Sequence, residues 1–152
     1  MYYLDSSAIV KIYLSEAGSE WVRKLRYRSR RVEIAICEIV GAEVFAAFYR
    51  RFRSGDLSKE NLQTACELFR NDYERLFVRL PVTKTVVDTG MQLIQKYPLR
   101  GYDSIQLARA ISFLNQLQKL NGEILNFVGA DNNLNNAARS EGLTVINPNE
   151  QS

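Results

Sequence analysis

Short apolar runs alternate with longer amphipathic stretches along the whole chain. Runs bounded by polar or turn-forming residues are typical of buried strands. They lie at 2–4, 32–36, 77–80, 124–128 and 144–146. Between them apolar residues recur at the spacing of one helix face, as at Ala8, Ile9 and Ile12. This pattern predicts helices at 6–13, 19–25, 38–53, 58–73, 83–97, 102–119 and 134–141.

Strands separated by helices favour right-handed crossover connections between parallel strands. The pattern therefore predicts an α/β fold with three α/β/α layers and a mainly parallel sheet of about five strands. The chain has 152 residues, which suits one domain with a real core. Because it contains no repeat, low-complexity tract or linker, residues 1–152 are expected to form a single domain.

Four carboxylates lie where predicted strands give way to helices. Asp5 and Asp131 come directly after the first and fourth strands. Glu43 and Asp103 lie near the starts of two helices. In parallel sheets, ligands bind outside the carboxyl ends of the strands. The sequence thus permits all four side chains to meet in one crevice.

The absence of histidine narrows the chemistry that these acids can support. A catalytic serine or cysteine would lack its usual imidazole base. A histidine-bound zinc site is excluded, and two cysteines cannot form a thiolate cage. Clustered carboxylates repel one another unless a cation neutralises them. The hard cations Mg²⁺ and Mn²⁺ are the natural partners of such a cluster.

Each polar residue also has a structural interpretation. Asp5 and Asp131 could simply cap helices, and Asp103 could be satisfied by first-turn N–H groups. For one acid alone, structure outweighs function, but four together favour a site. Ser6 is expected to orient Asp5 or a metal-bound water, or merely to cap a helix. Asn132 and Asn135 could donate hydrogen bonds to the ligands, or could be surface residues.

The charge distribution gives a weaker signal. The net charge is only +3, with basic clusters at 23–31 and 50–53. Such clusters can follow a phosphate backbone, but a solvated helix face is the favoured interpretation. No apolar run is long enough to cross a membrane, and no signal peptide is evident. With Cys37 and Cys66 in apolar stretches, free thiols and a cytoplasmic location are expected.

Four ordered segments resemble PIN-domain proteins, particularly the VapC-type toxins. The segments are YLDSSAIVKIY at 3–13, AEVFAA at 42–47, LRGYDSIQLARA at 99–110 and FVGADNNLNNAA at 127–138. The resemblance spans the chain and implies a metal-dependent ribonuclease of the PIN fold. Its acidic cluster would be Asp5, Glu43, Asp103 and Asp131.

The resemblance also implies a mechanism and partners. RNA would be cleaved by water activated by Mg²⁺ or Mn²⁺, leaving a 3′-hydroxyl and a 5′-phosphate. Such proteins are usually the toxin of a toxin–antitoxin pair and form homodimers. The antitoxin blocks the acidic pocket, often with a basic side chain. We expect the helical region 58–73 to contact a partner, and the RNA target is not encoded in a short motif.

Two positions depart from the pattern of this family. Gly129 and Cys37 stand where Ser or Thr is common. Neither change removes a proposed ligand, although each could weaken the support of the acids. A haloacid-dehalogenase-type phosphatase is disfavoured because Ser7 stands where its second aspartate would be. A flap-endonuclease-type DNA nuclease would be longer. The remaining alternative is a non-catalytic PIN-like module that binds RNA or protein.

Overall fold

Five short parallel strands form one sheet in the computed structural model, which describes residues 1–28 and 32–151. The strands are β1 (Tyr2–Leu4), β2 (Ile34–Cys37), β3 (Val78–Leu80), β4 (Asn126–Val128) and β5 (Thr144–Ile146). Their order across the sheet is β3-β2-β1-β4-β5. Tyr3 of β1 is in register with Ala35 of β2 and Phe127 of β4. The predicted parallel sheet is confirmed.

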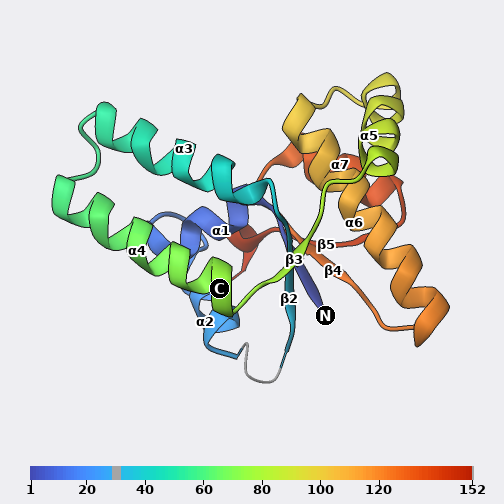
Figure 1. Ribbon diagram of the computed structural model, residues 1–152, viewed down its shortest axis with the longest axis horizontal. Helices are drawn as coiled ribbons and strands as arrows, with labels where there is room; N and C mark the ends of the chain where they lie inside the picture. Colours follow the sequence, from blue (N-terminus) through green and yellow to red (C-terminus); the bar gives the residue numbers. More distant parts are fainter. Residues whose placement is uncertain (29–31, 152) are drawn as a thin grey trace.

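Helices cover both faces of this sheet (Figure 1). The helical elements are α1 (Ser6–Tyr13), α2 (Ser19–Tyr27), α3 (Val40–Arg53), α4 (Lys59–Arg75), α5 (Lys84–Lys96), α6 (Gly101–Leu120), α7 (Asn132–Ser140) and the 3₁₀ turn η2 (Pro148–Glu150). In Figure 1, α1 to α4 lie on one side of the sheet and α5 to α7 on the other. The α/β/α prediction is therefore confirmed.

Successive side chains along each strand point to opposite faces of the sheet and enter two different hydrophobic cores. In β1, Leu4 joins the core beneath α1 to α4, whereas Tyr3 joins the core beneath α5 to α7. The first core is rich in aromatic rings, with Phe48 and Phe69 fully buried. The second is mainly aliphatic and includes several alanines of α6 and α7. Both faces are buried, which explains why the strands are apolar runs rather than alternating patterns.

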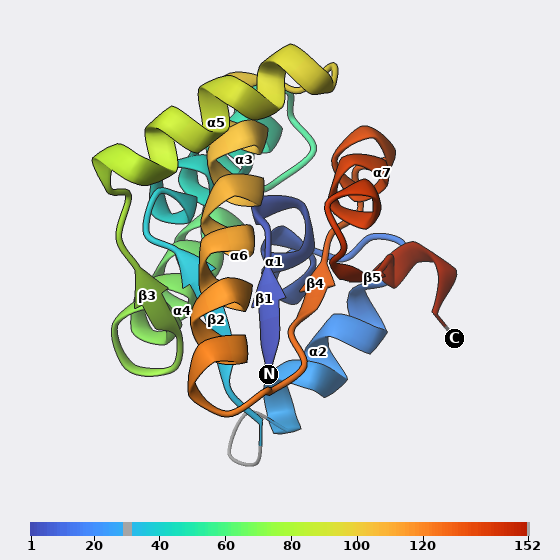
Figure 2. The same cartoon turned by 90° about the vertical axis from the view of Figure 1, so that its right-hand side faces the viewer.

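The strand order places a topological switch point beside β1. The chain moves from β1 to β2 on one side, and later returns to β4 on the other. Figure 2 shows α1 and α7 leaving the carboxyl ends of the adjacent strands β1 and β4. A crevice at this position is the usual ligand site of an open α/β sheet.

Several predicted element boundaries shift by one or two residues. The helix predicted from Glu38 begins at Val40, because the Glu38 N–H still donates to the Leu80 carbonyl, at 2.9 Å, and extends the sheet. Val32 precedes β2 instead of belonging to it. Arg30 and Arg31 of the predicted basic cluster lie outside the described residues. Among the described helices, none is both long and apolar enough to span a bilayer.

Candidate active site

Asp5 directly follows the carboxyl end of β1. Its side chain is only 2% exposed. Oδ1 caps α1 by accepting the Ala8 N–H at 2.9 Å and also accepts the Ser7 hydroxyl at 2.7 Å. Oδ2 accepts no hydrogen bond from the described residues. Asp5 is thus a helix cap with one oxygen left for a ligand.

Ser7, rather than Ser6, orients this carboxylate. The Ser7 Oγ accepts the Ala130 N–H at 2.8 Å while donating to Asp5, so it ties the end of β1 to the chain after β4. Ser6 lies instead beside Glu43, where its hydroxyl helps to lower the pKa of that carboxyl. Ser6 was predicted to orient Asp5, but the hydroxyl that donates to Asp5 is that of Ser7. The reason is geometric, since only Ser7 faces β4.

Glu43, on α3, is held by the side-chain amide of Gln106 on α6. The Gln106 Nε2 donates to Glu43 Oε2 at 2.5 Å. The Tyr3 hydroxyl contacts Gln106 Oε1 at 3.0 Å, which fixes which end of the amide faces the acid. Both Tyr3 and Gln106 are buried, so this chain of contacts is built into the core. Gln106 therefore positions Glu43.

Asp103 and Asp131 lie on the more open side of the crevice. Asp103 belongs to the first turn of α6, and Asp131 caps α7 by accepting the Leu134 N–H on Oδ1 at 2.8 Å. Burial raises the pKa of Asp103, and the negative charge of Asp131 raises it further. The positive charge of Arg100 opposes this rise. The two acids are therefore close enough to repel one another.

Burial and the charges of neighbouring acids raise the pKa values of three of the four acids. Burial raises the pKa of Asp5 to about 7, and the charges of Glu43 and Asp103 contribute to the rise. Burial likewise raises the pKa of Glu43, with a further contribution from Asp103. Each carboxylate makes the next harder to ionise. The four predicted residues are thus one electrostatic cluster.

A cavity of about 340 Å³ is lined by two of the four acids, Glu43 and Asp103, whereas Asp5 and Asp131 are not among its lining residues. Its walls are Ser6, Ser7, Val10, Glu43, Ala46, Ala47, Arg50, Arg100, Tyr102 and Asp103. The two acids in its lining are half-buried, while the two arginines and the tyrosine are exposed. Arg50, Arg100 and Tyr102 were not singled out from the sequence for this role. Their proximity to the acids arises from α3 and α6 facing each other across the sheet end.

The donor chemistry fits Mg²⁺ or Mn²⁺, although no closed cage is preformed. Within residues 1–28 and 32–151, no three acidic, cysteine or histidine side chains are close enough to be a ready-made cation site. Mg²⁺ needs no such cage, since it usually keeps several waters and takes one or two carboxylates. Asp5 Oδ2 and the repelling carboxylates supply suitable hard oxygens. The residues present therefore fit a partly hydrated cation.

Gly129 and Asn135 pack against Asp5 as a complementary pair. A Cβ added at Gly129 would lie 2.8 Å from Asn135 Oδ1 and 2.9 Å from Asp5 Oδ2. Asn135 is fully buried, and its Nδ2 donates to the Gly129 carbonyl at 2.8 Å. Its Oδ1 has no hydrogen-bond partner in the described structure. Asn135 was predicted to donate a hydrogen bond to the ligands, but the atom on the side of Asp5 is its unpartnered Oδ1. The Asn135 amide also fills the space that a side chain at position 129 would need.

The other candidate positions are less engaged. Asn132 is exposed at the start of α7 and makes no side-chain hydrogen bond among the described residues. Cys37 is buried in β2, and burial raises the pKa of its thiol, so the group stays protonated. Beside Gly129, the Ala130 N–H donates to the Ser7 hydroxyl, which in turn donates to Asp5. Neither departure from the family pattern leaves Asp5 unsupported.

The basic segment around α2 is largely committed to internal contacts. Arg26 forms an ion pair with Asp72, Lys24 pairs with Glu20, and Arg23 donates to the Ile12 carbonyl. These bonds join α2 to α1 and α4. The interpretation as a helix surface is therefore better supported here than a phosphate-binding track.

Sequence comparison places the chain among known proteins. The sequence model of the PIN domain matches residues 2–126. The chain is 31% identical over 147 residues to Ribonuclease VapC46 of Mycobacterium tuberculosis, covering 96% of each protein.

Solved structures resemble the fold across nearly its whole length. One is FitAcB from Neisseria gonorrhoeae, with a TM-score of 0.63, 17% identity, and 97% and 98% of the two chains covered. Another is VapBC2 from Rickettsia felis bound to a promoter DNA fragment, with a TM-score of 0.63, 16% identity and coverage of 96% and 97%. A third is a toxin–antitoxin complex from Klebsiella pneumoniae, with a TM-score of 0.61, 15% identity and coverage of 97% and 98%.

Proposed function

The chain belongs to the PIN-domain family, and on that basis we propose that residues 1–152 form a single domain that acts as a metal-dependent endoribonuclease. The observation that carries the proposal is the electrostatic cluster at the switch point. Asp5 is buried beside Glu43 and Asp103, and no side chain within the described residues forms an ion pair with it. The ribonuclease name of the M. tuberculosis relative supports RNA as the substrate.

The four acids would act together as ligands of the cation. Asp5, Glu43, Asp103 and Asp131 would hold the cation, and the anionic substrate phosphate would be held through the cation and not by the acids themselves. Mg²⁺ or Mn²⁺ supplies the charge that activates water and stabilises the leaving oxygen. The water oxygen bonds to phosphorus, the bond from phosphorus to the 3′-oxygen breaks, and a proton reaches that oxygen. The products are a 3′-hydroxyl and a 5′-phosphate.

The surrounding residues keep the ligands in a fixed orientation. Ser7 and the Ala8 N–H hold Asp5 through Oδ1, which leaves Oδ2, on the side of Gly129, without a hydrogen bond from the described residues. Gln106 does the same for Glu43. Because burial raises the pKa of Asp5 to about 7, a cation bound there at acidic pH would have to displace a proton. Loading at acidic pH is therefore disfavoured.

The proposed biological partner is an antitoxin protein. The VapBC2 structure and the Klebsiella pneumoniae toxin–antitoxin complex share this fold. A cavity of about 520 Å³ between α3 and α4 is lined by aromatic and charged side chains, including Phe45, Phe69 and Arg70. Leu68 is exposed on the same helix α4. We propose that an amphipathic segment of the antitoxin binds in this cavity. Leu68 borders two other cavities and would make a separate contact.

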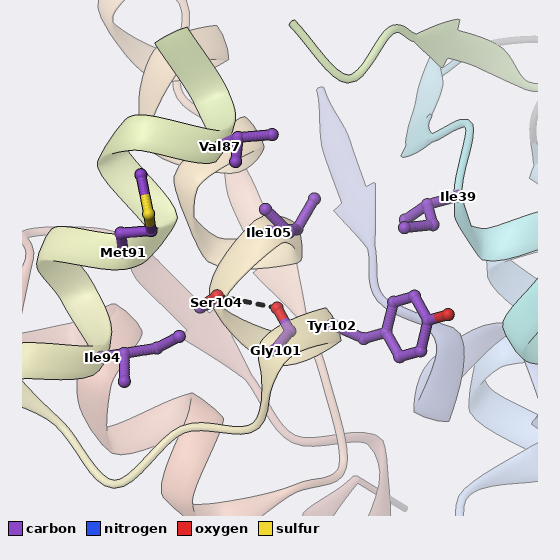
Figure 3. Close-up of a pocket in the computed structure, with 8 residues that line it drawn as sticks. All are labelled: Ile39, Val87, Met91, Ile94, Gly101, Tyr102, Ser104 and Ile105. Carbon is purple, nitrogen blue, oxygen red and sulfur yellow. Dashed lines mark hydrogen bonds between the residues drawn. The ribbon is translucent and has the colours of Figure 1, made fainter. Parts of the chain in front are cut away.

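We propose a homodimer through a second surface, on α5 and α6. Val87, Met91 and Ile94 are exposed there, and Figure 3 shows them beside Ser104 and Ile105 of α6. These apolar side chains border a shallow cavity of about 420 Å³. A second copy would cover them. A Met91→Glu variant that remained dimeric in light scattering would argue against this surface.

The proposed location is the cytoplasm. An RNA substrate is available there, and both Cys37 and Cys66 are free, as expected of a reducing compartment.

The test is cleavage of a total RNA pool by antitoxin-free protein in Mg²⁺, Mn²⁺ or EDTA. Asp5→Asn should abolish cleavage while the fold is retained. Asp88→Asn is the matched control, because it neutralises an exposed carboxylate on α5 that pairs with Lys84. We expect discrete metal-dependent fragments with 5′-phosphate ends from the native and Asp88→Asn proteins only.

Two outcomes would contradict the proposal. Folded protein that binds RNA but never cuts it would indicate the non-catalytic binding module. Equal cleavage by Asp5→Asn, or in EDTA, would indicate a contaminating nuclease.

A further inference from the structure

Two arginines and a tyrosine border the cavity that contains Glu43 and Asp103. Arg50 comes from the later part of α3, Arg100 immediately precedes α6, and Tyr102 lies in the first turn of α6. Both arginines are exposed, and Tyr102 is 57% exposed. Tyr102 also lines the cavity that contains Met91 and Ile94, and in Figure 3 its ring extends from α6 toward Ile39.

The two guanidinium groups are not used to hold the fold together. Within residues 1–28 and 32–151, neither Arg50 nor Arg100 forms an ion pair. Neighbouring arginines behave differently: Arg51 is paired with Glu16, and Arg26 with Asp72. Arg50 and Arg100 therefore keep their positive charge available at the cavity mouth.

This placement works against cation binding unless an anion shares the site. Arg100 and Asp103 line the same cavity and are only three residues apart in the chain. A positive charge beside the acids must repel a metal ion in the same cavity. A phosphodiester between them would reverse the effect, because phosphate attracts both the metal ion and the guanidinium groups. Two exposed arginines and two half-buried acids in the lining of one cavity suit a polyanionic substrate that also binds a cation.

We propose that Arg50, Arg100 and Tyr102 form a docking rim for single-stranded RNA. The arginines bind the phosphates on either side of the cleaved bond, and one unpaired base stacks on the Tyr102 ring. Guanidinium groups suit phosphate through paired N–H donors. Aromatic side chains bind bases that have been released from a duplex. The inference rests on the proposed ribonuclease function, because it assigns the substrate path of the same cavity.

The first test measures RNA binding without cleavage. In the Asp5→Asn background with EDTA, anisotropy of a short fluorescent single-stranded RNA gives the Kd. Arg50→Gln and Arg100→Gln should each weaken binding roughly fivefold and reduce the salt slope by about 0.7, the value for one phosphate contact. Tyr102→Leu should weaken binding roughly tenfold on single-stranded RNA and little on a matched duplex.

Arg53→Gln is the matched control. Arg53 lies on the same helix, where its guanidinium stacks over Tyr49 with Cζ 5.7 Å from the ring centroid. It does not line the cavity, so its removal should leave the Kd unchanged. An equal loss in Arg53→Gln, or no loss in the rim variants, would overturn the proposal.

The second test measures metal binding, because loss of Arg100 should change the affinity for Mn²⁺ in the opposite direction to the affinity for RNA. Titration calorimetry with Mn²⁺ and no RNA should give equal or tighter binding for Arg100→Gln, because a repelling charge has been removed. A merely structural arginine would lower both affinities when lost. Weaker Mn²⁺ binding together with weaker RNA binding would therefore contradict the rim.

The two proposals can fail separately. Rim-dependent RNA binding without cleavage by native protein would sustain the rim and reject the nuclease. Native cleavage with unchanged KM in the rim variants would sustain the nuclease and reject the rim. Loss of antitoxin binding with unchanged RNA binding would assign these residues to a protein partner instead.

Discussion

Asp5 and Asp72 are equally buried, at 2% exposure, but their surroundings are opposite. Asp72, on α4, accepts two hydrogen bonds from Arg26, at 2.6 and 2.7 Å, and a third from the Tyr13 hydroxyl at 2.7 Å. Asp5 receives hydrogen bonds only from Ser7 and Ala8, and its nearest charged neighbours are acids. One carboxylate is neutralised by the protein, and the other is not.

The difference separates a structural carboxylate from a functional one. Burial of a carboxylate is costly unless a counterion and hydrogen bonds compensate for it. Arg26 meets that need for Asp72 and joins α2 to α4. At Asp5 the cost remains, and the pKa rises to about 7. A bound cation could compensate for this cost at Asp5. Burial of a carboxylate therefore leads to a stabilising ion pair at Asp72 and to a candidate cation site at Asp5.

Asp72→Ala should have the largest effect on stability. It leaves Arg26 and the Tyr13 hydroxyl without their acceptor in a largely buried position. Loss of one partner of a buried pair costs about 3–5 kcal/mol. Urea unfolding should show this loss, while cleavage per folded molecule is unchanged. Asp88→Ala, which breaks the exposed pair with Lys84, is the control and should be neutral. Equal losses of stability in Asp72→Ala and Asp88→Ala would show that the buried pair stabilises the fold no more than the exposed pair does.

The metal-free protein should lose stability as pH rises. Because the folded state raises the pKa of Asp5 from 3.8 to about 7, it binds this proton more tightly than the unfolded chain does. The resulting stabilisation is complete below about pH 4, is lost through about pH 7, and amounts to at most about 4 kcal/mol. Unfolding in EDTA across this range measures it. Saturating Mg²⁺ at pH 8 should restore stability, by about 2.7 kcal/mol at a hundredfold excess over Kd.

Asp5→Asn provides the control for this pH effect. The asparagine cannot ionise, and its amide can donate toward the unpartnered Asn135 Oδ1. The pH slope should therefore shrink, and Mg²⁺ should stabilise the variant less than the native protein. An unchanged slope in Asp5→Asn would place the titrating group elsewhere.

Gly129→Ala should have a smaller effect, by crowding the region around Asp5. The new Cβ would lie 2.8 Å from Asn135 Oδ1, which is closer than such contacts normally allow. Overpacking of this kind costs about 1–3 kcal/mol. Thermal unfolding should show the loss, and combining it with Asn135→Ala should cost less than the sum of the single variants.

The control for this crowding is Gly101→Ala. Nothing lies within 4 Å of a Cβ at Gly101, which begins α6. Alanine there should leave stability unchanged or raise it slightly. Additive effects of Gly129→Ala and Asn135→Ala would show that the two residues are not coupled.

Local sequence features were sufficient to predict the elements and the acids. Asp5 and Asp131 cap α1 and α7 through contacts three residues along the chain, and such contacts follow directly from residue type and spacing. Alternation of strands and helices gave the parallel sheet for the same reason. The boundary errors at Glu38 and Val32 arose where a sheet hydrogen bond or a turn overrode the apolar pattern.

The sequence by itself therefore determined the α/β architecture and the placement of four carboxylates at the ends of strands or the starts of helices. Only the tertiary structure decided which side chains support and surround them. Gln106 reaches Glu43 across 63 residues, and Ser7 reaches Ala130 across 123. Such pairs depend on strand order and on how helices pack across the sheet, which residue type and local periodicity do not specify. The same packing brings Arg50 and Arg100 to one cavity mouth and leaves Asp5 without a counterion.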